Sequence, residues 1–133
     1  MEIIDIYKSK IETFRFYVNY MTKMIIIYLA VIGALAKFAL DRNSTPQLFY
    51  TLTMAGVLFC IWTLITLRLH YLSARSLRNS LNALAEKLEI TEHNEDATRF
   101  CKFITFLEAF NYVIFAGFVV FAVIGPDVLL KMS

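Results

Sequence analysis

The stretch MIIIYLAVIGALAKFAL, residues 24–40, decides the fold of this chain. It has 17 residues. A helix of that length rises about 26 Å, which is the short end of what crosses the hydrocarbon core of a bilayer. Lys23 precedes the stretch, and Lys37 lies one turn from its outer end, where a long side chain can reach the interface. The stretch therefore predicts a membrane-spanning helix.

Two further apolar stretches predict a second and a third span. Residues 48–67 carry no charged side chain, and residues 103–124 carry one, Glu108. Thr45 followed by Pro46 predicts the start of the second helix, because threonine caps helix N-termini and proline fits the first helical position. Gly125 and Pro126 predict the end of the third helix, followed by a short tail. The expected fold class is an all-α integral membrane protein with three spans.

The composition agrees with one membrane domain covering residues 1–133. Hydrophobic residues make up 59% of the chain, whereas soluble domains are nearer half apolar. The net charge of +2 excludes a strongly basic surface for nucleic acid. Cys60 and Cys101 lie in separate elements without metal-ligand spacing, so we expect small buried side chains, no disulfide and no cofactor.

The first two spans are expected to continue into water as a cytosolic helical hairpin. In residues 1–23, apolar side chains recur at steps of three and four from Ile4 to Met21. Residues 68–90 repeat the rhythm through a candidate cytosolic interaction stripe, whose members are His70, Leu77, Leu81, Leu84 and Leu88. The two stripes could close on each other or pack against other subunits. Alternatively, residues 1–23 form an amphipathic helix on the inner leaflet. A break at 91–94, which includes His93, precedes the third helix.

The charges predict the orientation. With three spans, segments 1–23 and 68–102 lie on one side and hold ten Lys or Arg residues, against three on the other side. This asymmetry favours a cytosolic N-terminus and an external C-terminus. A rival interpretation treats the first apolar stretch as a secretory signal with Ala34-Leu35-Ala36 as its cleavage site.

Two polar residues in the third span are candidate functional residues. Glu108 and Asn111 are three positions apart, so they share one helix face. An intramembrane acid usually faces protein or water, and the pair therefore predicts a pore or proton-path lining. The alternative is that Glu108 lies near the interface and pairs with Lys102 or Lys23. For His70, we expect packing rather than ligand binding.

Small residues in the spans predict where helices approach closely. Such positions let backbones come together within or between subunits. The candidate helix-packing residues are Ala30, Gly33, Ala34, Ala116 and Gly117.

The residues favour a non-enzymatic function. No nucleophile–base pair, carboxylate dyad, metal cluster or phosphate loop can be assembled from the sequence. Three helices are too few to enclose a pore, but several copies could do so around a rotation axis. The leading hypothesis is a homo-oligomeric channel or membrane-permeabilising effector. Its expected partners are the lipid bilayer, further copies of itself, and a cytosolic regulatory protein or small ligand. The alternative is a non-catalytic accessory or assembly subunit of a larger membrane complex.

A resemblance supports the leading hypothesis. The short-looped hairpin followed by the long helix RLHYLSARSLRNSL, residues 68–81, resembles the SLATT-type small membrane effectors of bacterial nucleotide-signalling and anti-phage systems. The likeness covers about residues 1–90 and is architectural. It implies pore formation in the bacterial inner membrane under the control of a sensor partner. The third span, residues 103–124, departs from the usual two-span plan, and no functional residue is carried over.

Overall fold

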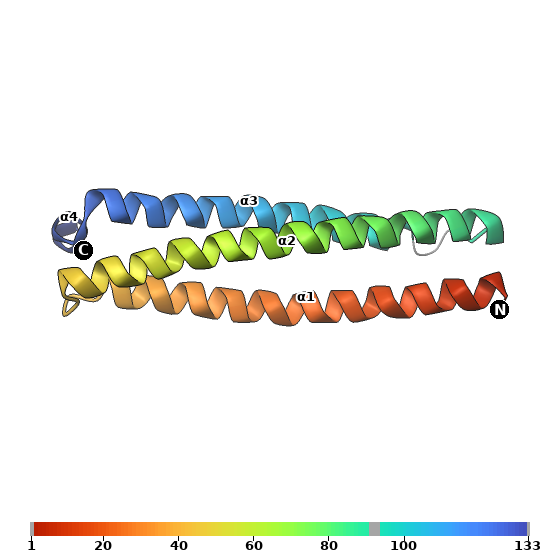
Figure 1. The fold of residues 1–133 in the computed structure, drawn as a ribbon, viewed down its shortest axis with the longest axis horizontal. Helices are drawn as coiled ribbons and strands as arrows, with labels where there is room; N and C mark the ends of the chain where they lie inside the picture. The colour runs from red at the N-terminus through yellow and green to blue at the C-terminus, as the bar shows by residue number, and fades with distance from the viewer. Residues whose placement is uncertain (1, 91–93, 133) are drawn as a thin grey trace. The chain divides into compact units, whose positions relative to one another are not determined.

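The computed structural model describes residues 2–90 and 94–132, and every regular element in them is a helix. Figure 1 labels these helices. Their bounds are α1 Ile3–Ala39, α2 Pro46–Leu88, α3 Asn94–Ile124 and α4 Pro126–Met132. The expected all-α class is confirmed, and α1, α2 and α3 are each long and apolar enough to cross a membrane. The predicted break at 91–94, with His93, lies outside the described residues except for Asn94.

Local hydrogen bonds explain where α2 begins and ends. The backbone N–H of Leu48 donates to Thr45 Oγ1 at 3.2 Å, which is the predicted N-cap. At the other end Glu89 takes a positive φ of 55°, and the N–H of Ile90 reaches back to the Ala85 carbonyl at 2.9 Å. A residue with positive φ followed by such a backward hydrogen bond is a common C-terminal cap of helices, and glycine is the residue usually found at the positive-φ position.

The end of the chain differs from the expected tail. Gly125 ends α3 with a φ of 81°, as its position predicted. The following residues form α4, a further helix, rather than an irregular tail. Pro126 occupies its first position, and Asp127 and Lys131 lie in its first and last turns, where the helix dipole favours their charges. Seven residues are too few for hydrophobic periodicity to reveal such a helix.

The chain divides into two compact units, and each of the three long helices contributes to both. Unit 1 contains residues 1–24 and 66–108, and unit 2 contains residues 25–65 and 109–133. The units are therefore described separately.

In unit 1 the two predicted stripes pack on each other within the chain. Leu77 and Leu81 are buried in a cluster with Tyr7, and Ile11 of α1 packs against it. Leu84 and Leu88 are partly buried against the same cluster. A second cluster joins Met21, Leu67 and Ile104, one from each long helix. The two stripes therefore close on each other within the chain, and packing of either stripe against other subunits stays a prediction.

In unit 2 a close helix contact lies at a residue that is not among the predicted helix-packing positions. A cluster of Ile32, Cys60 and Phe118 brings α1, α2 and α3 together. Gly56 of α2 is buried beneath the Phe118 ring, and a methyl group on Gly56 would collide with that ring. Gly56 has no small partner four residues away that would form a small-xxx-small pattern, because Leu52 and Cys60 occupy those positions.

Gly56 and Gly33 offer a matched pair of substitutions. Alanine in a helix gains about 1 kcal/mol of propensity over glycine, whereas overpacking a tight contact costs about 1–3 kcal/mol. Gly56→Ala should therefore lower the midpoint of thermal unfolding in mild detergent, followed by circular dichroism. Gly33→Ala, with nothing within 4 Å of the added carbon, should leave the midpoint unchanged or raise it. Equal shifts in the two variants would contradict the close approach at Gly56.

Candidate functional site

A buried polar cluster links the three long helices in unit 2. Asn111 of α3 is fully buried. Its Oδ1 accepts a hydrogen bond from the Tyr28 hydroxyl of α1, and its Nδ2 donates to the backbone carbonyl of Cys60 in α2 at 3.0 Å. One amide thus engages both neighbouring helices with its two ends. Asn111, predicted as a candidate pore residue, points into the interior of its own unit.

Tyr28 is positioned for this bond by an aromatic neighbour. Its ring stacks on Phe59 of α2, with centroids 5.7 Å apart and an interplanar angle of 15°. The stacking places the hydroxyl deep enough to reach α3. The sequence gives no sign of this role, because a tyrosine near a span end does not reveal which partner its hydroxyl meets.

Glu108 of unit 1 forms an ion pair with Arg68. Glu108 Oε2 lies 3.9 Å from Arg68 Nη1, and the side chains are 17% and 62% exposed, respectively. The other oxygen, Oε1, is buried without a hydrogen-bond partner among the described residues. The partner is therefore Arg68 rather than Lys102 or Lys23. Arg68 also lies over the Tyr71 ring, 5.4 Å from its centroid, so this guanidinium is held on two sides.

His70 is an aromatic packing residue in unit 1. Its ring lies 5.8 Å from that of Tyr17 and 5.6 Å from that of Tyr20, measured between centroids. Both tyrosines belong to α1, so His70 contributes to the contact between α1 and α2. The described residues contain no group of three His, Cys, Asp or Glu that could hold a metal ion.

The candidate small residues are not the contacts that hold unit 2 together. Ala30, Gly33 and Ala34 are exposed on α1, and Ala116 is exposed on α3. Gly33 and Gly117 have nothing within 4 Å of an added carbon. Their use in packing between subunits stays a prediction.

The exposed side of α2 in unit 1 carries a second periodic stripe that the sequence analysis did not single out. We call it the outer stripe; it consists of Leu69, Leu72, Ser76, Asn79 and Ala83, all exposed. Its steps of 3, 4, 3 and 4 follow one helix face. The cytosolic interaction stripe, which we call the leucine stripe from here on, gave the stronger sequence pattern because Leu77, Leu81, Leu84 and Leu88 make it more apolar.

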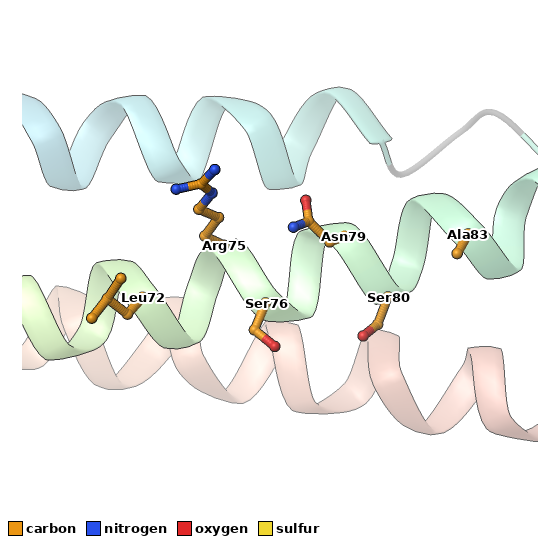
Figure 2. A pocket seen from close by; sticks show the side chains of 6 residues that line it. All are labelled: Leu72, Arg75, Ser76, Asn79, Ser80 and Ala83. Atoms are coloured by element: carbon orange, nitrogen blue, oxygen red, sulfur yellow. The ribbon is translucent and has the colours of Figure 1, made fainter.

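A shallow open groove of about 510 Å³ follows the outer stripe from Leu72 to Ala83. Figure 2 shows Arg75 and Asn79 extending to one side of α2, and Ser76 and Ser80 to the other. The groove is lined by Leu72, Arg75, Ser76, Asn79, Ser80 and Ala83. Its polar groups are one guanidinium, one amide and two hydroxyls, so it offers hydrogen-bond donors and acceptors and no acid.

The Tyr28–Asn111 bond should contribute measurably to stability. Asn111→Ala should cost about 1–2 kcal/mol of unfolding free energy, because it leaves a buried hydroxyl without its acceptor. Tyr28→Phe should cost less, and the two changes combined should cost less than their sum because they remove the same bond. Unfolding in mild detergent measures all three. Asn19→Ala, at an exposed asparagine of α1, is the control. An Asn111→Ala variant as stable as this control would contradict the cluster.

Comparison with known proteins adds no relative: no protein-family model, curated protein or solved structure matches this chain.

Proposed function

We propose that the chain is a three-pass membrane protein of the bacterial inner membrane whose copies assemble into a channel or a membrane-permeabilising effector. Membrane insertion is supported by the apolar surface that the helices leave exposed. In the most apolar windows of α1, α2 and α3, only 11%, 22% and 11% of the residues are buried by the chain itself. Lipid tails are the solvent in which such surfaces are stable.

The same proposal assigns the N-terminus to the cytosol and the C-terminus to the outside. The ten-to-three distribution of Lys and Arg supports this orientation. Unit 1 would then hold the cytosolic parts of the helices, through which a regulatory protein or small ligand would control the assembly. The architectural resemblance to SLATT-type effectors extends the proposal to anti-phage defence.

The outer stripe is the observation that supports self-association of copies. The leucine stripe is already used inside unit 1, so the outer stripe is the periodic face that α2 leaves uncovered. Copies inserted in one membrane share one orientation, and a stripe facing the symmetry axis meets its own counterpart. Ser76, Asn79 and Ala83 are small or polar enough for close contact, and a self-paired Asn sets register in parallel helices.

Glu108 and Arg68 are proposed to lie at the inner mouth of the permeation path. Arg68 immediately precedes Leu69 of the outer stripe, so the ion pair flanks the proposed contact between copies. A carboxylate with one exposed partner can exchange that partner for a passing cation. The carboxylate would therefore favour cation over anion passage.

Disulfide trapping tests the contact between copies. A Ser76→Cys variant in vesicles should form a disulfide-linked dimer on mild oxidation, because Ser76 would face its counterpart across the axis. Cys60 and Cys101 are buried and free, so they should give little background. Ser9→Cys, at an exposed serine of α1, is the control. Equal linkage at both positions would contradict an α2-centred contact.

Leakage from liposomes tests permeation. The unmodified chain should raise ion leakage, and Glu108→Gln should reduce the preference for cations over anions severalfold because the charge at the mouth is lost. Glu12→Gln, at an exposed acid, should leave the preference unchanged. A monomer that never leaks would contradict the channel. Co-purification with a larger complex, without leakage, would favour the accessory subunit instead.

A further inference from the structure

The positive charges of unit 1 are concentrated next to the predicted spans. Residues 13–24, 66–80 and 97–108 contain seven Lys or Arg and one acid, Glu108. The remaining aqueous segments, 2–12 and 81–96, contain three Lys and eight acids. Each helix is thus basic near its span and acidic farther away.

Four of these cations form what we call the basic collar, which consists of Arg15 and Lys23 of α1 and Arg99 and Lys102 of α3. All four are exposed. Arg68 is left out because its ion pair with Glu108 is assigned to the mouth of the proposed permeation path. Arg75 is left out because it borders the outer stripe, and Arg78 because it is only partly exposed.

Packing within unit 1 brings the collar segments of α1 and α3 together. Phe14, next to Arg15, meets Phe100, next to Arg99, with ring centroids 5.5 Å apart. Met21 shares a buried cluster with Cys101 and Ile104, which lie on either side of Lys102 and Phe103 in the sequence. Because a helix rises about 1.5 Å per residue, Arg15, Arg99 and Lys102 lie near the level of this ring contact, and Lys23 lies about two turns nearer the spans.

Large aromatic side chains are exposed among the collar cations. Phe16 and Tyr20 of α1 are 69% and 40% exposed and stack on each other, with ring centroids 6.5 Å apart. Phe103 and Phe106 of α3 are 43% and 63% exposed. Aromatic rings interleaved with cations are typical of protein surfaces in the headgroup layer of a membrane. These groups come from both α1 and α3.

We propose that the basic collar binds anionic phospholipid headgroups. The phosphate groups would lie against the four cations, among the exposed aromatic rings. This inference rests on the proposed membrane insertion. It does not depend on channel activity or on the number of copies.

The test uses the full chain reconstituted in phosphatidylglycerol or in phosphatidylcholine. The unmodified chain should retain phosphatidylglycerol through purification and unfold at a higher temperature in it. A collar variant with Arg15, Lys23, Arg99 and Lys102 changed to Gln should retain on the order of tenfold less phosphatidylglycerol and lose the temperature difference. The control changes Lys8, Lys10, Lys87 and Lys131 to Gln, which removes the same four charges.

The outcomes separate this inference from the proposed function. Loss of phosphatidylglycerol retention in the collar variant alone supports the collar, and equal loss in the control would overturn it. If the collar variant does not fold, raising the salt concentration on the unmodified chain provides the second measurement, because screening should weaken retention. A chain that resists carbonate extraction but shows no lipid preference overturns only the collar. A chain that carbonate extracts from vesicles overturns the membrane proposal as well.

Discussion

Three helices cannot cover their own apolar surface, and that constraint shapes the rest of the structure. A helix in a three-helix arrangement touches its neighbours along one side, and the opposite side of α1, α2 and α3 remains apolar and exposed. Because a helix satisfies its backbone hydrogen bonds internally, the exposed side needs only an apolar solvent to be stable. The hydrophobic effect in lipid gives little drive for helices to associate, so specific contacts must hold them.

Unit 2 meets that requirement with a polar contact and a close approach. The two ends of the Asn111 amide bond to α1 and to α2, which fixes the rotation of α3 about its own axis. Gly56 lets the Phe118 ring lie against the α2 backbone. Hydrogen bonds and close packing both remain effective between helices in lipid, where burial of leucines against each other gains little.

Unit 1 is held together in another way. Its clusters are built from leucines, aromatic rings and small side chains at heptad spacing, as in helical bundles in water. His70 packs between two tyrosines, and Glu108 neutralises Arg68 near the point where the charges become sparse. The change in contact type along the same three helices agrees with the proposed passage from water into lipid.

The sequence by itself determined the helices, and the tertiary structure decided which face of each helix is used. Apolar length, the Thr45 cap and Gly125 act locally, so the long helices and most of their ends could be predicted from the sequence. The role of Asn111 could not be predicted, because the helices that pack against α3 decide which of its faces is buried. For the same reason, only the tertiary structure shows that Gly56 rather than Gly33 lies at a close helix contact. It also shows that the leucine stripe is buried and that the outer stripe of α2 is exposed.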